Sequence, residues 1–328
     1  MLASSGAPYA RILSVGSAIP SRVVTNADMC QWIESTDEWI QQRTGIAERR
    51  WIGPDESVRT LALAAARTAI DRSSLPLGEI DCLILSTVSF FQQTPALAPM
   101  LAAELGLRDA AAYDISAACA GFCYGIAQAE ALIRAGQAHN VVVIGAETLS
   151  RMTDVTDRST AFLFADGAGA VVVGGSDEPG IGPVVWGSDG EHNEVIWQTA
   201  EWDEALRLGA EPKIGMNGQA VFKWATSFIA TAAKRALEAA GLSPEELDVF
   251  LPHQANNRIT DTMLRYLKLP ERVVVARTIK KYGNNSAASI PIAMDELLST
   301  GQAKSGQTAL IIGFGAGLVY AGQVIKLP

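Results

Sequence analysis

An internal repeat constrains the fold of this 328-residue chain more than any other feature of its sequence. The segment AARTAIDRSSLPLGEID (65–81) resembles AAKRALEAAGLSPEELD (232–248), and further along ALIRAGQA (131–138) resembles ELLSTGQA (296–303). The two matches occur in the same order, at offsets of 167 and 165 residues. Repeats of this kind indicate that one structural unit occurs twice. We therefore expect two similar halves related by a pseudo-twofold axis.

Short apolar runs alternate with alanine-rich helical segments in both halves. Runs of this length and composition are typical of buried strands, and they are DCLILSTVS (81–89), NVVVIGAE (140–147), AGAVVVGG (168–175), DVFLPHQ (248–254) and TALIIGFG (308–315). The alternation predicts an α/β fold. Together with the repeat, it predicts two α/β halves at residues 1–178 and 179–328.

Composition and charge argue against several classes of protein. A chain of this length with 48% hydrophobic residues can bury one large core or two ordinary ones. The net charge of −9 opposes general nucleic-acid binding, which needs a basic surface. No uncharged apolar run approaches the roughly 20 residues of a membrane span, and the amino end MLASSGAPYARIL lacks the pattern of a signal peptide. We expect a cytoplasmic protein whose four cysteines are reduced.

Two of these cysteines lie among small residues in DISAACAGFCYG (114–125). The residues after Cys119 have helical periodicity up to Gly136, so Cys119 should lie at or just before a helix amino terminus. Free backbone N–H groups and the helix dipole favour a thiolate there. Packing in the core is the alternative for any cysteine, and we retain it for Cys123. A metal site at the two cysteines is excluded, because no further ligand pair has structural-zinc spacing.

A histidine and an asparagine are candidates for the same site. His139 and His192 lie in polar loops, whereas His253 follows an apolar run in VFLPHQAN, at a strand end where α/β sheets present functional groups. The offset of 165 residues pairs Cys119 with Asn284 of YGNNSAAS, which places each at the start of a corresponding helix. A structural histidine and an ordinary turn asparagine are the alternatives. Convergence of the three residues near the pseudo-twofold axis predicts an active site.

The glycine-rich loop GFGAG (313–317) resembles the start of a dinucleotide-binding motif. No βαβ unit follows it in this sequence, so we expect no nucleotide cofactor. Such a loop can instead bring backbone N–H groups close to a substrate oxygen. The chain contains no G-x-S-x-G elbow, which argues against an α/β-hydrolase.

Three segments, ISAACAGF, LPHQANNRI and KYGNNSAASIP, resemble the active-site segments of the thiolase superfamily and, within it, of the β-ketoacyl-acyl-carrier-protein synthase III family. TDEWIQQRTGI (36–46), TDRSTAFLFADGAGA (156–170) and GFGAG extend the resemblance over nearly the whole chain. It implies the thiolase fold, a duplicated α/β unit layered α-β-α-β-α. It also implies a homodimeric acyltransferase that initiates type II fatty-acid synthesis.

The resemblance implies roles for the three candidate residues. Cys119 would take the acyl group of an acyl-CoA as a thioester. His253 and Asn284 would stabilise the enolate that malonyl-acyl-carrier protein leaves when it loses carbon dioxide, and backbone N–H groups of Cys119 and Ala316 would hold the tetrahedral oxyanion. Ala316 interrupts three glycines that many relatives carry. Because decarboxylation generates the nucleophile, no metal or redox cofactor is expected.

The resemblance also implies where CoA binds. Trp39 and Arg158 would sandwich its adenine and Arg43 would bind a phosphate, since a guanidinium plane stacks on aromatic rings and pairs with phosphates. Phe122 and Phe314 would line the cavity, with ordinary core packing as the alternative.

Two further expectations concern the partner and the primer. Arg258 and Arg265 lie seven residues apart on one predicted helical face, with Lys268 a turn further, and this basic face is a candidate for docking the acidic carrier protein. Thr94 stands where many bacterial relatives have a phenylalanine that reaches into the partner subunit's acyl pocket. A more open pocket would favour longer or branched primers, unless nearby phenylalanines refill it.

Two alternatives remain open from the sequence. The same catalytic residues fit a priming or chain-terminating synthase of polyketide or quinolone metabolism. A non-catalytic scaffold member of the fold is the alternative from another class, because function belongs to the site rather than to the fold. The sequence does not identify the primer or the carrier protein.

Overall fold

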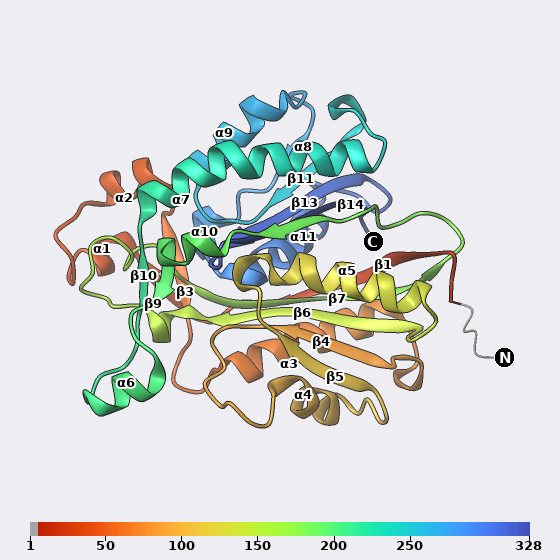
Figure 1. Cartoon of the computed structure of the whole chain (residues 1–328), viewed down its shortest axis with the longest axis horizontal. Coiled ribbons are helices and arrows are strands. Elements are labelled where there is room, and N and C mark those ends of the chain that lie inside the picture. The colour runs from red at the N-terminus through yellow and green to blue at the C-terminus, as the bar shows by residue number, and fades with distance from the viewer. Residues whose placement is uncertain (1–5) are drawn as a thin grey trace.

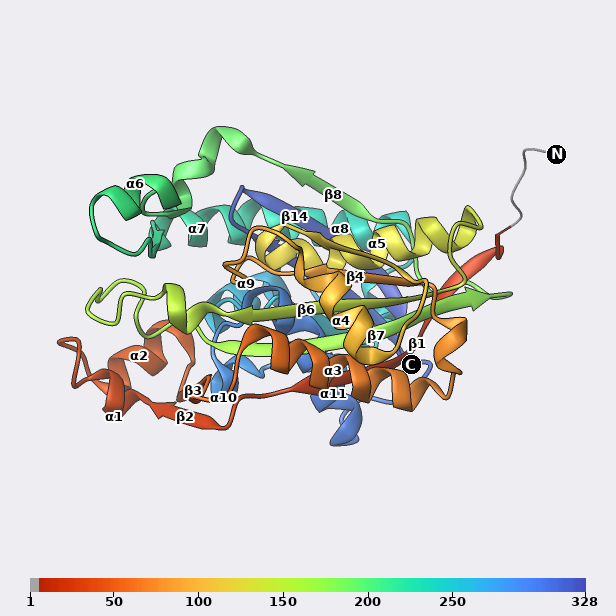
Figure 2. The same ribbon diagram turned by 90° about the horizontal axis from the view of Figure 1, so that it is seen from below.

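The computed structural model describes residues 6–328, and their helices and strands form five layers (Figures 1 and 2). Two five-stranded sheets are separated by one layer of helices and covered outside by two more. This confirms the α/β class and the α-β-α-β-α layering. The first five residues, part of the amino end in which we expect no signal peptide, lie outside the described residues.

The first sheet has the strand order β1-β7-β6-β4-β5. Strand β4 is parallel to β5 and β6, whereas β7 is antiparallel to β6 and to β1. The strands are β1 (Tyr9–Ala18), β4 (Cys82–Ser86), β5 (Ala111–Ile115), β6 (Asn140–Thr148) and β7 (Asp166–Ser176).

The second sheet repeats this pattern with the order β12-β11-β13-β14-β8. Strand β11 is parallel to β12 and β13, and β14 is antiparallel to β13 and to β8. The strands are β8 (Val185–Ser188), β11 (Val249–Pro252), β12 (Val274–Val275), β13 (Thr308–Gly315) and β14 (Val319–Lys326). The sheets therefore match strand for strand, as the repeat predicts, while the boundary between residues 178 and 179 stays a prediction.

Each layer of helices packs on a sheet through a face of small or branched residues. Helices α3 (Val58–Ser73) and α4 (Leu97–Leu105) cover the outer face of the first sheet, and α8 (Ala230–Ala239) and α9 (Asn257–Leu267) cover that of the second. Helices α5 (Gly121–Arg134) and α11 (Ser289–Ser299) fill the central layer. The repeated segments thus occupy equivalent layers.

The alanine pattern explains how closely the outer helices approach their sheets. Ala62, Ala65, Ala66 and Ala69 of α3 are all fully buried and recur at helical spacing. A side chain at Gly16 of β1 would come within 2.6 Å of the backbone nitrogen of Ala69. Small residues on both surfaces are therefore required at this contact.

Shorter elements gather at one end of the layers, at the left in Figures 1 and 2. They are β2 (Arg22–Thr25), α1 (Asn26–Met29), α2 (Asp37–Thr44), β3 (Glu48–Trp51), β9 (Ile196–Gln198), α6 (Trp202–Arg207), β10 (Ile214–Met216), α7 (Gly218–Trp224) and α10 (Ile279–Tyr282). The buried guanidinium of Arg49 in β3 donates to the carbonyls of Val24 in β2 and of Phe162, each at 3.1 Å, and so joins this strand pair to the segment before β7.

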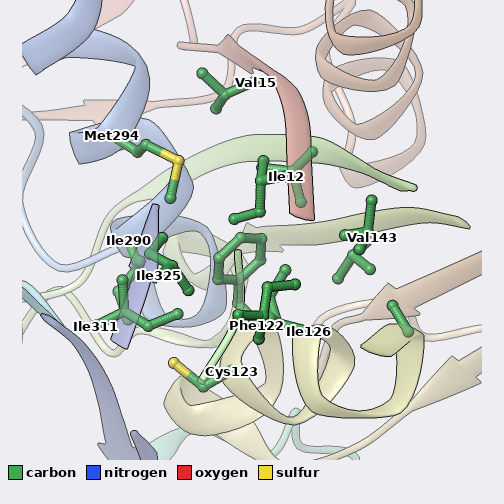
Figure 3. Packing of buried hydrophobic residues seen from close by; sticks show 14 of the residues in the cluster. Ile12, Val15, Phe122, Cys123, Ile126, Val143, Ile290, Met294, Ile311 and Ile325 are labelled. Atoms are coloured by element: carbon green, nitrogen blue, oxygen red, sulfur yellow. The ribbon is translucent and has the colours of Figure 1, made fainter. Parts of the chain in front are cut away.

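The central layer forms the core between the two sheets (Figure 3). Phe122 and Cys123 of α5 are fully buried and pack in one cluster with Ile290 and Met294 of α11. Burial raises the pKa of Cys123 to about 12, so this thiol stays protonated. The packing role expected for Cys123 is confirmed.

Removing the Phe122 side chain should leave a large cavity in this layer. We expect Phe122→Ala to lower the free energy of unfolding by about 3–5 kcal/mol, measured by urea denaturation. Phe228→Ala is the matched control, since that ring is 45% exposed and its removal should cost much less. Equal losses for the two variants would contradict the central position of Phe122.

Candidate active site

Cys119 lies in a short 3₁₀ helix, η2 (Ala118–Ala120), that leads directly into α5. This confirms its position just before a helix amino terminus. Ala118 has a left-handed φ of 43°, which turns the chain sharply between β5 and α5. The second half has the same device, since η7 (Ser286–Ala288) leads into α11 and Ser286 has a φ of 47°.

The equivalence of η2 and η7 corrects one expectation. Ala118 corresponds to Ser286, an offset of 168 residues, so the counterpart of Cys119 is Ala287 and not Asn284. The reason is helix length, because α5 has 14 residues and α11 has 11. An offset of 165 therefore holds only at the helix ends where the repeat was recognised.

Asn284 is nevertheless directed at the site by its own hydrogen bonds. Its backbone is anchored to Leu163 and Ala165, and its Oδ1 accepts from the backbone N–H of Ser286 at 3.0 Å. Oxygen and nitrogen of an amide are told apart by such bonds. With Oδ1 occupied, the side-chain Nδ2 makes no hydrogen bond within residues 6–328 and can donate to a ligand.

His253 follows β11, as expected, and is only 2% exposed. Burial lowers the pKa of His253 to about 3, so its imidazole is neutral. Nδ1 lies 2.7 Å from the hydroxyl oxygen of Ser289, and that oxygen already accepts from the backbone N–H of Gln254 at 3.3 Å. Within residues 6–328 the hydroxyl proton of Ser289 has no other acceptor, so we assign it to Nδ1, which leaves the ring proton on Nε2.

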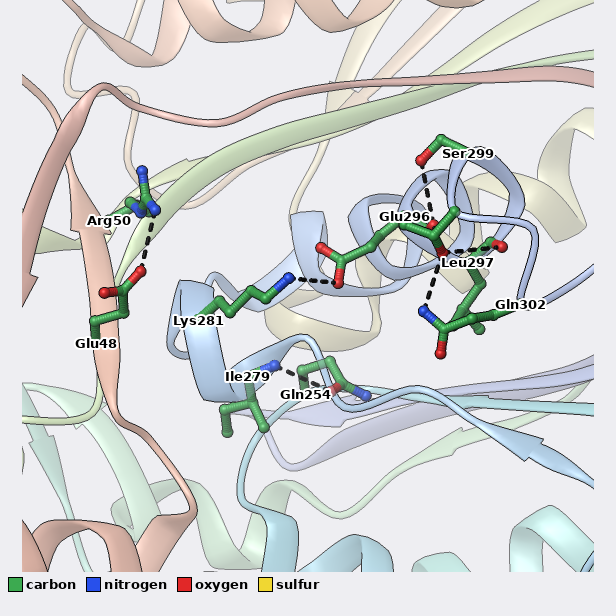
Figure 4. Close-up of polar contacts among 10 residues, drawn as sticks. Glu48, Arg50, Gln254, Ile279, Lys281, Glu296, Leu297, Ser299 and Gln302 are labelled. Atoms are coloured by element: carbon green, nitrogen blue, oxygen red, sulfur yellow. Dashed lines mark hydrogen bonds and ion pairs between the residues drawn. The ribbon is translucent and has the colours of Figure 1, made fainter.

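Gln254, next to His253 in the chain, is held by hydrogen bonds of both ends of its side chain, of which Figure 4 shows the one with Ile279. Its Oε1 accepts from the backbone N–H of Ile279 at 3.3 Å, and its Nε2 donates to the carbonyls of Pro252 and Ala276. On the other side, the ring of Phe314 meets His253 edge to face, with 5.3 Å between centroids. These contacts leave the imidazole one orientation.

The electrostatics of Cys119 differ from the expectation of a thiolate. Burial raises the pKa of Cys119 to about 12, and the nearby Glu147 carboxylate adds to this, although a side-chain hydrogen bond with Ser286 lowers it. The resting group is therefore a thiol. The position before α5 was predicted correctly, but loss of water outweighs it.

Strand β13 passes directly over the sulfur. A Cβ built on Gly315 would lie 2.8 Å from Cys119 Sγ, and one on Gly313 would lie 2.8 Å from Cα of Ala120. Only glycine permits this approach. Ala316 has no left-handed φ, so its methyl group is compatible with the loop, and the role of its N–H stays a prediction.

A cavity of about 460 Å³ lies between α2, α7 and the start of α9. The ring of Trp39 lies on its wall, with the guanidinium carbon of Arg158 at 5.1 Å and that of Arg43 at 5.5 Å from the ring centroid. The structure therefore brings these three residues together. Arg258 lines the same cavity, its guanidinium carbon 5.1 Å from the Phe222 ring centroid.

The rest of the basic face lies along α9. Arg265, in its last turn, is exposed and donates to the hydroxyl of Thr262 at 3.0 Å. Lys268 does not extend the helical face as expected, because it follows the end of α9 with a left-handed φ of 53°.

Three other expected contacts lie away from this cavity. Phe122 is a core residue (Figure 3), and Phe314 is 2% exposed and packs against His253 and Trp224. Neither is among the residues that line the cavity. Thr94 is exposed, in the loop before α4.

Sequence reasoning missed the polar residues that support the three candidates. Ser286 and Ser289 stand in the quoted KYGNNSAASIP segment, but no pattern showed their hydroxyl contacts. The clearest signal available in the sequence was Glu147, an acidic residue at the end of the apolar run NVVVIGAE, which the structure buries fully.

Two other sequence expectations concern metal and membrane. Within residues 6–328, no group of three or more His, Cys, Asp or Glu side chains is placed to hold a metal ion. No helix in the same part of the chain has the length and apolar character needed to cross a bilayer.

Two family models match the chain. The one described as 3-oxoacyl-[acyl-carrier-protein (ACP)] synthase III matches residues 113–190, and the one described as its C-terminal part matches residues 237–327.

Similar proteins match over nearly their whole length. The β-ketoacyl-[acyl-carrier-protein] synthase III 1 of Streptomyces coelicolor is 54% identical, covering 99% of this chain and 98% of the relative. The mycobacterial β-ketoacyl-[acyl-carrier-protein] synthase III of Mycobacterium avium is 49% identical, with the same coverage.

Solved structures agree with these matches. The priming β-ketosynthase of the R1128 polyketide pathway superposes with a TM-score of 0.97 at 44% identity, covering 100% of this chain and 98% of that one. The 3-oxoacyl-[acyl-carrier-protein] synthase III of Aquifex aeolicus VF5 gives 0.90 at 37% identity, covering 97% and 99%. The chain therefore belongs to the β-ketoacyl-acyl-carrier-protein synthase III family, condensing acyltransferases with the thiolase fold.

Proposed function

We propose that this chain condenses an acyl-CoA primer with malonyl-acyl-carrier protein through a thioester on Cys119, the step that initiates type II fatty-acid synthesis. One observation carries the proposal. The turn η7 and the first residue of α11 together contact all three candidate residues, because Ser286 bonds to Cys119 and to Asn284 while Ser289 bonds to His253. A thiol and two neutral N–H donors thus share one site.

Loading of the primer requires the sulfur of Cys119 to attack the acyl-CoA carbonyl. Because Gly315 carries no side chain, no Cβ stands 2.8 Å from the sulfur at this position. We assign the developing oxyanion to the backbone N–H groups of Cys119 and Ala316, since preorganised donors stabilise charge that appears in the transition state. CoA leaves as a thiolate, and the acyl group stays on Cys119.

Condensation uses the other two residues. The Nε2–H of His253 and the Nδ2–H groups of Asn284 would donate to the carbonyl oxygen of the malonyl thioester, which becomes an enolate oxygen as carbon dioxide leaves. The low pKa of His253 suits this step, because a charged imidazolium would protonate the carbanion. The carbanion instead attacks the Cys119 thioester and releases the β-ketoacyl product. This chemistry needs no metal or redox cofactor.

The cavity at Trp39 is suited to CoA. A guanidinium near an aromatic face can bracket a purine ring, as Arg158 does beside Trp39. Arg43 and Arg258 at the same cavity supply charge for phosphates. We propose that the phosphopantetheine of the carrier protein uses this entrance too, with Arg265 and Lys268 contacting the acidic protein around it.

The primer and the assembly remain part of the proposal. We propose a cytoplasmic homodimer in which Thr94, exposed on the single chain, faces the partner's acyl pocket and admits longer or branched primers. Phe91, which could refill that pocket, instead packs its ring on Trp202, with 5.2 Å between the ring centroids.

A priming reaction in polyketide synthesis is the second candidate. It is favoured by the similarity to the R1128 priming ketosynthase, at 44% identity over the whole chain. The two candidates share the chemistry at Cys119 and differ in the carrier protein. Measuring kcat/KM for malonyl-carrier proteins of fatty-acid and of polyketide synthesis would distinguish the two candidates.

The thioester can be detected directly. Incubation with acetyl-, isobutyryl- and octanoyl-CoA should raise the mass of the intact protein by one acyl group, and Cys119→Ala should abolish the increase. We expect isobutyryl- and octanoyl-CoA to load better than acetyl-CoA. Wild-type protein that acquires no acyl group from any of them would refute acyl-CoA as the donor, and a clear acetyl preference would refute the role of Thr94.

Gly315 provides a test of the space above the sulfur. Gly315→Ala places a methyl group 2.8 Å from Cys119 Sγ, so acyl loading should fall by about a hundredfold, as expected when reacting groups are displaced by about an ångström. Gly190→Ala is the control, because nothing lies within 4 Å of its added Cβ. Normal loading by Gly315→Ala would show that the carbonyl approaches from elsewhere.

Charge reversal at Arg265 tests carrier-protein docking. Arg265 does not line the cavity, so Arg265→Glu should raise the KM for malonyl-acyl-carrier protein and leave acyl-CoA loading unchanged. Arg258→Glu should impair both, because Arg258 lines the cavity. Steady-state kinetics with each substrate varied measure the difference. If Arg265→Glu leaves the KM for malonyl-acyl-carrier protein unchanged, the carrier protein does not dock on α9.

A further inference from the structure

We propose that Glu147 and Ser286 form a proton relay that takes the proton of Cys119 during acyl loading and returns it when the β-ketoacyl product leaves. The inference rests on the proposed function, because it requires Cys119 to be the nucleophile. Glu147 lies near the end of β6 in the first half of the chain, and Ser286 lies in η7 of the second. Glu147 is a positioning residue, since it reaches Cys119 only through Ser286.

Glu147 is fully buried, yet its carboxylate has an unusual set of partners. Its Oε2 accepts from the hydroxyls of Ser89 at 2.6 Å and Thr87 at 3.3 Å and from the backbone N–H of Val88 at 3.2 Å. Its Oε1 accepts from the hydroxyl of Ser286 at 3.3 Å. No Lys, Arg or His of residues 6–328 pairs with it.

Burying the Glu147 carboxylate lowers stability, so packing alone does not explain its presence. A buried carboxylate without a cation pays a desolvation cost that its hydrogen bonds offset only in part. Groups held in this condition beside a reactive residue are concentrated at functional sites. Only the side chain of Ser286 lies between Glu147 and Cys119 in the hydrogen-bonded chain. This position indicates that Glu147 takes part in the chemistry of the thiol.

One hydroxyl contacts both ends of the proposed relay. The hydroxyl of Ser286 donates to Oε1 of Glu147 at 3.3 Å, and the Ser286 side chain also makes a hydrogen bond with Cys119 that lowers the pKa of the thiol and so favours loss of its proton. The left-handed backbone of Ser286 sets the hydroxyl at this position, because the same turn brings η7 against β6. A proton leaving the sulfur can pass to Ser286 Oγ as the hydroxyl proton passes to Glu147.

His253 does not provide an alternative acceptor. Its Nδ1 accepts from Ser289, and its Nε2 carries the ring proton. With a pKa of about 3, the imidazole is also a poor base. The residue that is best arranged to donate to the enolate is therefore badly arranged to deprotonate the thiol, and a second group must do so.

The proton balance closes over one cycle. In loading, the sulfur–carbon bond forms while the Cys119 proton moves through Ser286 to Glu147, and CoA departs as a thiolate that is protonated by solvent. Decarboxylation releases carbon dioxide and no proton. When the carbanion has attacked, the tetrahedral intermediate expels the Cys119 thiolate, which recovers its proton from Glu147 through Ser286. The enzyme returns to its starting state.

The pH dependence of loading should therefore report on Glu147. Burial raises the pKa of Glu147 to about 7, so it is ionised, and able to accept, above that pH. The other titratable groups around it are Cys119 on η2, with a pKa of about 12, and Asp166 opposite Thr148 on β7, with a pKa of about 6. Neither η7 nor the loop at residues 87–91 carries a titratable side chain.

The experiment is a rapid-quench measurement of acyl loading between pH 5.5 and 9, with the acyl-CoA that labels wild-type protein most. The wild-type rate should rise with pH through a midpoint near 7. Glu147→Gln should lose this rise and load at least about tenfold more slowly at pH 7.5. Ser286→Ala should do the same, and it keeps the backbone N–H that orients Asn284.

Two further variants identify the titrating group. Thr87→Val removes one donor to Glu147 without touching Cys119, so its midpoint should move to higher pH while the plateau rate is retained. Ser150→Ala removes a donor to Asp166 instead and should leave the midpoint in place. Because Thr87→Val keeps Glu147, it tests the relay even where Glu147→Gln does not fold.

The outcomes separate the relay from the function on which it rests. A uniform fall in the rate of Glu147→Gln and Ser286→Ala, with the wild-type midpoint kept, would show a purely structural role and overturn the relay. The relay would also be overturned if the pH midpoint of loading shifted in Ser150→Ala and stayed in place in Thr87→Val. Failure of the wild-type protein to load any acyl-CoA, with Cys119→Ala as the blank, would instead refute the proposed function.

Discussion

The site depends on two close backbone contacts between the halves, each made possible by a glycine. In β6 of the first half, a Cβ on Gly145 would lie 2.3 Å from the carbonyl oxygen of Ala287 in η7. In β13 of the second half, a Cβ on Gly313 would lie 2.9 Å from the carbonyl oxygen of Cys119 in η2. Each half therefore presses a central strand onto the turn of the other. Without both contacts, the candidate residues would not share one site.

The two glycines are equivalent positions, and the same equivalence explains how the halves diverged. Gly145 and Gly313 are 168 residues apart, as are the turn residues Ala118 and Ser286. By the same spacing, Glu147 corresponds to Gly315. The first strand places a carboxylate at this position, and the second places no side chain against the sulfur. A symmetric framework supports an asymmetric reaction, because the side chains at matching positions differ.

Much of this could be predicted from the sequence, for physical reasons that apply residue by residue. Cys119 and His253 were placed correctly because helix periodicity and a strand end can be read locally. The pairing of Cys119 with Asn284 was wrong, since a helix three residues shorter in the second half changes the offset within one element. The thiolate expectation failed because burial depends on distant segments. The contacts of Ser286, Ser289 and Glu147 join residues 36 to 139 positions apart, which local patterns do not show.

The paired turns have a consequence for how this family can change. Ala118 and Ser286 adopt left-handed backbone at residue types other than glycine, and the turn that contains each packs against a glycine of a central strand in the opposite half. Each half on its own would lack the strand that packs against its turn. Substitutions at either turn are therefore limited by a strand of the other half, so the two halves cannot vary independently at these positions.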